Sequence, residues 1–236
     1  NIEGNFIDAT DNGLLMDFIS GSKEKIISNN VITADFGAAF TTDHVSSGDI
    51  DVVFNTFTGN SSSTAVLKYG STSFGVPTIN FDFANNIAQH TNNGPVWSIG
   101  RNASAFSYSG RNNNYYTNGD TLVRAQDISY LNLSSFQTAY TADTNSVSLN
   151  SSFLADTLLK PYRPRLDDKG IYYSKYATDI AGVTRDTSNP DIGAYEFEPI
   201  EFNVKVDSAH IDTLCGGTQS ANLLVKNLAD SLVTEV

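Results

Sequence analysis

The sequence has a single cysteine, Cys215, and little charge, since only 17% of its 236 residues are Asp, Glu, Lys or Arg. One cysteine excludes an internal disulfide framework and a zinc site built on several thiolates. Only 14 residues are basic against 26 acidic ones, which gives a formal net charge of −12. That balance argues against nucleic acid and anionic membrane surfaces, which require a basic face. No run of about 18 apolar residues is present, so we expect no membrane insertion.

The polarity of the chain comes from uncharged residues. Asn, Ser, Thr and Gly take the place of charged groups, and 40% of the residues are hydrophobic. This composition is typical of short strands joined by many turns rather than of long helices. The first residues, "NIEGNFID", contain no initiator Met and no signal peptide, and they begin inside a repeating pattern. We therefore expect a piece of a longer protein.

One asparagine position recurs along the first half of the chain. Its occurrences are Asn5, Asn30, Asn55, Asn86 and Asn114, at intervals of 25, 25, 31 and 28 residues. Apolar residues stand three positions before and two positions after most of them, and a second apolar stretch follows about eight residues later. Each interval therefore offers two or three short strands. A unit of this size cannot bury its own apolar face, but units stacked about 4.8 Å apart bury a continuous core.

The predicted fold is an all-β, right-handed parallel β-helix, a solenoid whose turns (rungs) occupy residues 1–125. An antiparallel sandwich also alternates strands with turns, but the recurring columns favour the β-helix. Asparagine suits the repeated position because it tolerates the left-handed backbone of a tight bend. Its side-chain amide also forms hydrogen bonds between stacked strands. We expect the five asparagines to form one such ladder.

The pattern changes after Asn114. Ser134 followed by Gln137 predicts a short helix within residues 131–140. Residues 126–199 are expected to form a C-terminal cap with this helix and a closing strand, because a solenoid otherwise exposes a sheet edge. Arg185 is expected to fasten the closing strand by pairing with Asp191 or Glu196. Residues 200–236 alternate as half-buried strands but are too few for a sandwich of about 100 residues.

Residues 108–199 resemble the closing segment of bacterial parallel β-helix surface proteins of the type IX secretion kind. The resemblance is carried by "NNNYYTNGD", by "SSFQTAYTADTNSVSLNSSFL" and by a final pattern of Asp179, Gly182, Arg185 and "PDIGAYE" at 190–196. It implies a secreted or cell-surface protein and an incomplete immunoglobulin-like (Ig-like) module at 200–236. It also implies possible O-glycosylation where Asp-Ser or Asp-Thr precedes a small apolar residue. The hydroxyls concerned are those of Thr121, Thr157, Ser208, Thr213 and Ser231.

The strongest candidate site is acidic. Positions four and six residues before the repeated asparagine share one face of a strand. We expect them to form an outer patch of Asp49, Asp51 and Asp82, with Glu24 and Asn80 nearby. Such a patch suits Ca²⁺ or glycan binding, and its spacings of about 5 and 7 Å also suit a catalytic carboxylate pair. An ordinary solvated sheet face has the same composition.

Aromatic residues give a second candidate, because exposed rings stack on sugars. Trp97 is the predicted sugar-stacking residue, whereas Tyr115 and Tyr116 fall in columns that are apolar in earlier rungs and are expected in the core. No catalytic residues are assigned. His44, His90 and His210 are isolated, and no Ser-His-Asp set or G-x-S-x-G motif is present. The scattered cations are Lys68, Arg101, Arg111 and Arg124.

Three functions follow from these expectations. The first is a segment of a large secreted or surface protein that acts in adhesion or glycan binding or as a structural stalk, with no cofactor or with Ca²⁺. Its partners would be glycans or other surface and secretion-system proteins. The alternative is a fragment of a polysaccharide lyase or glycoside hydrolase whose catalytic rungs lie upstream of Asn1. The third is a passive spacer.

Overall fold

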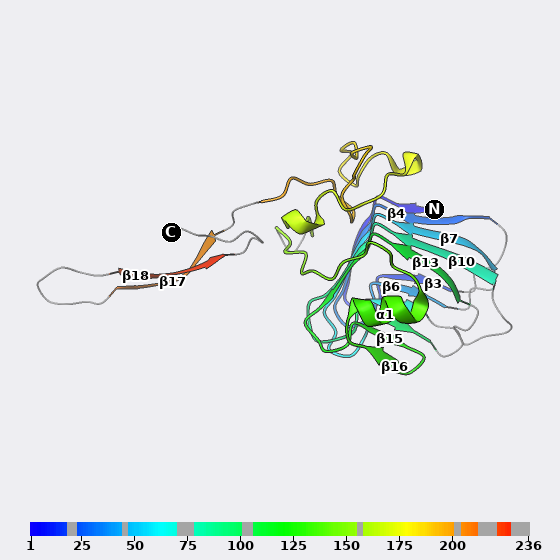
Figure 1. Cartoon of the computed structure of the whole chain (residues 1–236), viewed down its shortest axis with the longest axis horizontal. Coiled ribbons are helices and arrows are strands. Elements are labelled where there is room, and N and C mark those ends of the chain that lie inside the picture. The colour runs from blue at the N-terminus through cyan, green and yellow to red at the C-terminus, as the bar shows by residue number, and fades with distance from the viewer. Residues whose placement is uncertain are drawn as a thin grey trace, which may run out of the picture.

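Three sheets wrap around one core in the computed structural model (Figure 1). The structure describes residues 1–17, 23–43, 47–69, 78–100, 106–154 and 158–200, with the backbone alone for 47, 78–80, 106–107, 204–211 and 221–227. Sheet A contains β1 (Ile2–Glu3), β4 (Lys25–Ser28), β7 (Ser47–Val53), β10 (Thr78–Ala84) and β13 (Phe106–Arg111). Sheet B contains β2 (Phe6–Ala9), β5 (Val31–Ala34), β8 (Thr56–Gly59), β11 (Ile87–His90) and β14 (Asn114–Thr117). Sheet C contains β3 (Leu14–Met16), β6 (Phe40–Thr42), β9 (Leu67–Tyr69), β12 (Trp97–Ile99), β15 (Val123–Ala125) and β16 (Ile128–Tyr130).

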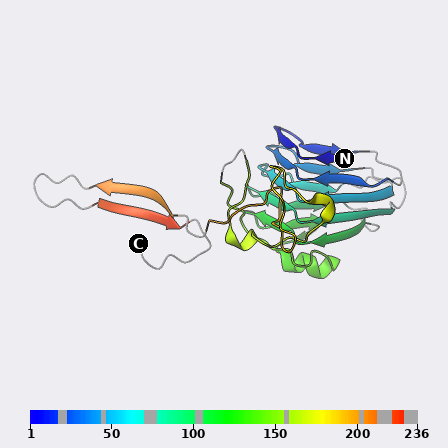
Figure 2. The same cartoon turned by 90° about the horizontal axis from the view of Figure 1, so that it is seen from above.

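The sheets form a parallel β-helix. Each rung adds one strand to each sheet, and successive rungs pair in parallel, as β5 does with β8 and β8 with β11. Only the last strand of sheet C, β16, pairs antiparallel among the described strands of the three sheets. Figure 2 shows the rungs stacked in chain order from the N-terminus to the green helix at the far end. The prediction of a β-solenoid rather than an antiparallel sandwich is therefore confirmed.

Apolar columns fill the space between the sheets. Phe57 stacks on Phe40 and Phe83 with ring centroids 5.7 and 6.3 Å apart, and Tyr115 continues the row 6.3 Å beyond Phe83. All four rings are at most 2% exposed. The four rings come from all three sheets: Phe40 from β6, Phe57 and Tyr115 from β8 and β14, and Phe83 from β10. The inward positions of the three sheets therefore meet in one core, and one stripe of inward residues in each sheet suffices to build it.

The asparagine ladder stands at the bend between sheets A and B. The Nδ2 atom of Asn5 donates to Oδ1 of Asn30, Asn30 donates likewise to Asn55, and Asn55 to Asn86, over 2.9, 2.9 and 3.0 Å. The same Oδ1 atoms also accept the main-chain N–H of the preceding ladder residue, at 2.9 to 3.0 Å. Four members of the predicted ladder are thus confirmed.

The fifth member is Asn113, not Asn114. The Nδ2 atom of Asn86 donates to Oδ1 of Asn113 over 3.2 Å, whereas Asn114 lies in β14 and donates to the main-chain oxygen of Leu149. The prediction was one residue out because three asparagines follow one another at 112–114. Tyr115 therefore occupies the core column, and Tyr116 lies half-buried outside it.

The left-handed residue of the bend is the one before each ladder asparagine. Its φ is positive at every rung: 69° at Gly4, 53° at Asn29, 58° at Phe54, 56° at Asn85 and 53° at Asn112. The two asparagines of "SNNV" at 28–31 therefore have different structural roles. Asn29 adopts the strained turn, and Asn30, which is fully buried, makes the ladder.

The last rung ends on Asp143. Its buried Oδ1 accepts from Nδ2 of Asn113 at 3.1 Å, and Oγ of Ser146 accepts the main-chain N–H of Asn113 at 2.9 Å. Asp143 and Ser146 thus accept the two hydrogen bonds that a further ladder asparagine would accept. Helix α1 (Leu133–Tyr140) closes the core at this end through Leu133 and Phe136. Its N-cap is Asn132, not the predicted Ser134, and Gln137 donates to the main-chain oxygen of Asp143.

Most of the predicted cap does not cover the last rung, and the predicted closing strand at 190–196 is irregular backbone instead. Residues 158–200, here called the C-terminal strap, run back along the side of the solenoid and include the 3₁₀ helices η2 (Pro164–Leu166) and η3 (Ser174–Tyr176). Ile192 packs on Ile87, and Ala194 and Tyr195 pack on Val31. The side chains of the left-handed column hold the strap: Asn29 bonds to Thr178, Asn85 to Ile171 and Asn112 to Lys169.

Arg185 forms hydrogen bonds both to other residues of the strap and to the solenoid. Its Nη1 donates to Glu196 Oε2 at 3.4 Å and to the main-chain oxygen of Asp191 at 3.3 Å. Its Nη2 donates to Oδ1 of Asn29 at 2.9 Å, and its guanidinium lies 3.9 Å from the ring centroid of Phe54. The predicted partner Glu196 is found, whereas the carboxylate of Asp191 instead accepts the main-chain N–H groups of Asp168 and Phe197.

Beyond residue 200 the structure describes two strands, β17 (Val204–Ile211) and β18 (Ala221–Asn227), which pair antiparallel. Among the described residues, no helix has the length and apolar character needed to cross a membrane.

Replacing Asn55 with Ala is expected to lower the free energy of unfolding by about 3 kcal/mol, because it leaves buried ladder donors and acceptors without partners. Asn60→Ala, at an exposed position, should change it by less than about 0.5 kcal/mol. Urea titrations of the two variants make the comparison. Equal losses would mean that the ladder does not stabilise the rungs.

Gly193→Ala is expected to loosen the strap. Gly193 has a φ of 90°, and a Cβ there would lie 2.7 Å from Cδ1 of Ile87. Gly182→Ala is the matched control, since its φ is 81° but a Cβ would meet nothing within 4 Å. The clash should add about 1 to 3 kcal/mol to the shared backbone strain. Hydrogen exchange of residues 158–200 should therefore be faster in Gly193→Ala, and equal exchange rates would contradict the docked position of Gly193.

Candidate functional site

The predicted acidic residues do lie on the outer face of sheet A. Asp82 pairs in register with Asp51, Asn80 with Asp49, and Asp51 with Ile26. The two columns proposed from the sequence therefore have the expected register. Asp49 is exposed, Asp51 and Asp82 are half-buried, and Glu24 is exposed at the neighbouring rung.

Cations neutralise this patch. Nη1 and Nη2 of Arg111 donate to both carboxylate oxygens of Asp82, at 2.7 and 2.8 Å. Nζ of Lys175, on the strap, lies 2.7 Å from Oε2 of Glu24 and 3.7 Å from Oδ2 of Asp51. The patch is therefore a mixed charge network, not an array of free carboxylates.

Two tyrosines of the strap lie over the network. The Tyr173 hydroxyl accepts a hydrogen bond from Arg111, and the Tyr176 hydroxyl donates to Oδ2 of Asp51 over 3.4 Å. Their rings meet edge to face with centroids 6.0 Å apart, and Tyr176 is only 5% exposed. The sequence pattern did not predict these partners, because they come from a segment about 120 residues downstream of Asp51.

The pKa values of Asp51 and Glu24, two carboxyl groups of the network, are shifted in opposite directions. Burial raises the pKa of Asp51 to about 6, with further contributions from its hydrogen bond to Glu24 and from the charge of Asp82. The hydrogen bond from Lys175 lowers the pKa of Glu24. Burial also raises the pKa of Tyr176, so its hydroxyl remains a donor at neutral pH. Opposed acidities of this kind are found in acid–base pairs.

The patch does not gather carboxylate oxygens for a cation. Among the described residues, the acidic side chains that form a group of at least three with oxygens within 4.8 Å of one another are Asp167, Asp168 and Asp191, on the strap. Asp191 already accepts two main-chain N–H groups, and burial raises its pKa to about 7. Its role is to hold the loop formed by the "PDIGAYE" stretch.

Trp97 is not available for sugar stacking. It is 2% exposed and packs in the core, 5.0 Å from Phe83 and 5.0 Å from Tyr108 between ring centroids. The prediction was wrong because β12 places Trp97 on its inward side, and Ser98 takes the outward position. Trp97 is close in sequence to other aromatic residues because it shares the core with them, not because they form an exposed binding surface.

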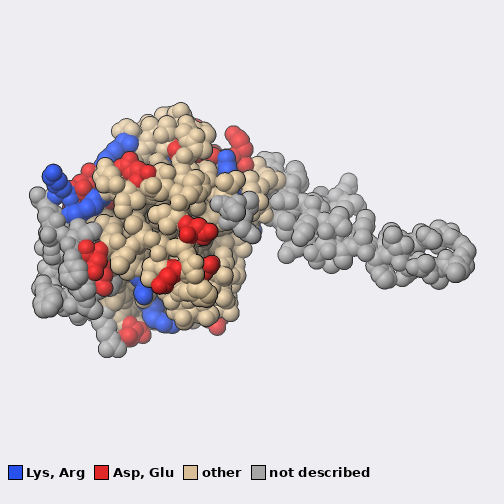
Figure 3. All heavy atoms as spheres, turned by 180° about the vertical axis from the view of Figure 1, so that it is seen from behind, with Lys and Arg blue, Asp and Glu red and all other residues tan. Residues whose placement is uncertain are grey.

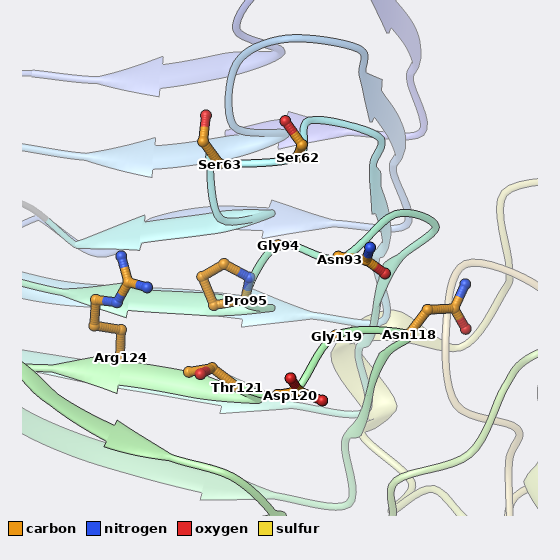
Figure 4. A pocket seen from close by; sticks show the side chains of 10 residues that line it. All are labelled: Ser62, Ser63, Asn93, Gly94, Pro95, Asn118, Gly119, Asp120, Thr121 and Arg124. Carbon is orange, nitrogen blue, oxygen red and sulfur yellow. The ribbon is translucent and has the colours of Figure 1, made fainter.

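A hollow of about 580 Å³ opens where the chain turns from sheet B to sheet C. Its lining comes from three successive rungs: Ser62 and Ser63; Asn93, Gly94 and Pro95; and Asn118, Gly119, Asp120, Thr121 and Arg124. Figure 4 shows the middle turn, with Asn93, Gly94 and Pro95, between a turn that carries Ser62 and Ser63 and a turn that carries Asn118 and Asp120. The lining is therefore polar, with one proline ring, one cation and one carboxylate.

His90 packs against Gly94, one of the residues that line the hollow. It is fully buried, its Nε2 lies 3.0 Å from the main-chain oxygen of Thr64, and its Nδ1 accepts the main-chain N–H of Asn92. These contacts fit a neutral ring, and burial lowers the pKa of His90. A Cβ at Gly94 would collide with Nε2 of this ring. A glycine is required there, and it leaves position 94 of the lining without a side chain.

The sequence pattern missed this hollow, although a signal was present. The turns "NSSSTAV", "TNNGPVW" and "TNGDTLV" at 60–66, 91–97 and 117–123 each precede a strand of sheet C and are rich in small polar residues. Of the predicted glycosylation positions, Thr121 lines the hollow. The structure gives only the backbone of Ser208, and Thr157, Thr213, Ser231, His44, Arg101 and Cys215 lie outside the described residues.

Comparisons of the chain with protein-family models, with curated proteins and with solved structures found no match.

Asp51→Asn is expected to change the pH dependence of stability. The folded-state pKa of about 6 lies above the ordinary value of 3.8, so the stabilising contribution of the protonated group is complete below pH 3.8 and is lost as pH rises through 6. The amide mimics the protonated form. The variant should therefore be more stable than wild type at pH 7.5, by on the order of 1 kcal/mol after allowance for solvent screening, and similar at pH 4.

Thermal unfolding between pH 4 and 8 measures this difference. Ser109→Ala serves as the control, because it lies in the same outer column two rungs on and carries no titrating group. Its curve should run parallel to that of wild type. A parallel curve for Asp51→Asn as well would show that Asp51 ionises in the fold as it does in the unfolded chain.

Proposed function

We propose that this chain is part of a secreted or cell-surface modular protein in which the β-helix is a rigid stalk that binds glycans. The observation that carries the proposal is the hollow at the turns between sheets B and C. Hydroxyl and amide groups from three rungs converge there on a space of about 580 Å³. Sugars offer many hydroxyls, and converging donors and acceptors recognise them by orientation.

The surface composition supports the proposal. Uncharged side chains dominate the face shown in Figure 3, and acidic side chains are scattered over it. Such a surface suits partners rich in hydroxyl groups better than phosphate-rich ones. The internally bonded ladder and the docked strap give the rigidity that a binding site on turns requires.

The finer assignment rests on analogy. The antiparallel pairing of β17 with β18 is compatible with the first strands of an Ig-like module. The resemblance of residues 108–199 to type IX secretion surface proteins motivates the secreted or cell-surface location, the right-handed coil, and partners among glycans or other surface proteins. Thr121 is a proposed glycosylation position.

An enzyme is the second candidate. Asp51 and Asp82 stand on adjacent strands, about 4.8 Å apart along the sheet, near the carboxylate separation of about 5 to 5.5 Å in retaining glycosidases. The raised pKa of Asp51 fits the acid of such a pair. However, Tyr173, Tyr176 and Lys175 lie over these carboxylates, so a substrate would have to displace the strap.

A polysaccharide panel tests the proposal. The purified chain is incubated with neutral and acidic polysaccharides, in Ca²⁺ and in EDTA, and both bound material and released oligosaccharides are measured. Ser62→Trp should block the hollow and weaken binding at least tenfold. Ser188→Trp, at an exposed position on the strap, should leave binding unchanged.

Binding without products, lost in Ser62→Trp alone, supports a glycan-binding stalk. Released products that disappear in Asp51→Asn would overturn it in favour of the enzyme. No binding to any polysaccharide would leave the structural stalk alone. A requirement for Ca²⁺ would show that an ion bridges sugar and protein.

A further inference from the structure

One outer column of sheet C carries two cations. Lys68 pairs in register with Ser98, and Ser98 with Arg124, so the three side chains lie in one vertical line on adjacent strands. Lys68 and Arg124 are exposed, and Ser98 between them is half-buried. With strands about 4.8 Å apart, the two charges stand about 10 Å apart along the solenoid axis.

These cations differ from the basic residues of the strap side. Arg111, Lys175 and Arg185 are each bound to a carboxylate. Lys68 and Arg124 have no carboxylate partner in the part of the chain that the structure describes. Their column continues with Thr41 above Lys68 and Ser129 beside Arg124, so it brings no acid. Two cations in register with no carboxylate partner among the described residues are unexpected in a chain with a net charge of −12.

Arg124 belongs to the hollow as well as to this column. It is one of the residues that line the hollow, and in Figure 4 its side chain extends from β15 toward the rung that carries Pro95. The hollow and the column therefore form one continuous surface. Hydroxyl and amide groups lie at one end of it, and positive charges lie along the other.

We propose that this surface selects acidic polysaccharides through their sugar carboxylates, an inference that rests on the proposed glycan binding and specifies its ligand class. One sugar occupies the hollow with its carboxylate on Arg124, whose planar fork of donors matches a carboxylate in two parallel hydrogen bonds. The polymer then runs along the solenoid axis across Ser98, and a carboxylate further along it meets Lys68. Asp120 and the serine and asparagine side chains of the hollow bind sugar hydroxyls.

The test compares carboxylated, neutral and sulfated polymers. The probes are polygalacturonate, alginate and hyaluronan, the carboxyl-reduced neutral form of polygalacturonate, and dextran sulfate. Dissociation constants are measured by isothermal titration at two salt concentrations for the wild-type chain and for Arg124→Gln and Lys68→Gln. Arg165→Gln and Lys169→Gln are matched controls, because both residues are exposed on the strap and neither lines this hollow or belongs to a strand of sheet C.

The expected result is binding to at least one carboxylated polymer that weakens about tenfold or more in Arg124→Gln and weakens as salt is raised. Lys68→Gln should weaken it in the same direction, and both controls should remain within twofold of wild type. Thermal melting checks that each variant is folded.

Equal binding to the carboxyl-reduced polymer would overturn the carboxylate assignment and leave glycan binding intact. Dextran sulfate bound as tightly as any carboxylated polymer would also overturn it, since charge alone would then suffice. Losses in the strap controls equal to that in Arg124→Gln would place the site elsewhere. No binding to any polymer, neutral ones included, would overturn the proposed function itself.

Discussion

The side-chain amide of the repeated asparagine is the interaction on which the structure depends. Each amide accepts the main-chain N–H and the side-chain N–H of one rung and donates to the next, so every bend between sheets A and B is fixed against its neighbours. The ladder asparagines are separated by 25, 25, 31 and 27 residues. The chain between two ladder positions can therefore vary in length while the strands on either side keep their register, which is the condition for a continuous core.

The residue before each ladder asparagine gives the same bend a second function. Its left-handed backbone directs a side chain outward, where Asn29, Asn85 and Asn112 bond to the strap. At the rung where this position is Phe54, no amide is available, and the guanidinium of Arg185 lies on the ring instead. Inner and outer columns at one corner thus tie the rungs to each other and the strap to the rungs. Cation–π contact and hydrogen bonds to neutral groups keep the buried Arg185 compatible with its surroundings.

Much of the fold was predictable from the sequence, because a solenoid repeats one local rule. Asn5, Asn30, Asn55 and Asn86 gave the rungs, and counting back from them gave the correct register of Asp51 and Asp82. The repeat did not identify the ladder residue at 112–114, because three asparagines follow one another there. It also did not predict that Trp97 is buried, because exposure depends on which side of the strand a residue occupies. The partners of the acidic patch were not predictable, because Lys175 and Tyr176 reach it through the path of an irregular segment. The line of Lys68 and Arg124 needed the register of sheet C, which has no marker residue of its own.

Asp143 gives the solenoid a chemical direction. An asparagine passes the ladder on, because it both donates and accepts, whereas an ionised carboxylate only accepts. Asp143 accepts hydrogen bonds from Asn113, Ser146 and the hydroxyls of Tyr108 and Tyr115, so its carboxyl serves as the acceptor that ends the ladder. Rungs such as 31–55 are interchangeable units, but the unit that contains Asp143 is a stop. Gain or loss of whole units during evolution would therefore be tolerated between Asn5 and Asn113 and would change the length of the solenoid without altering the end that contains Asp143.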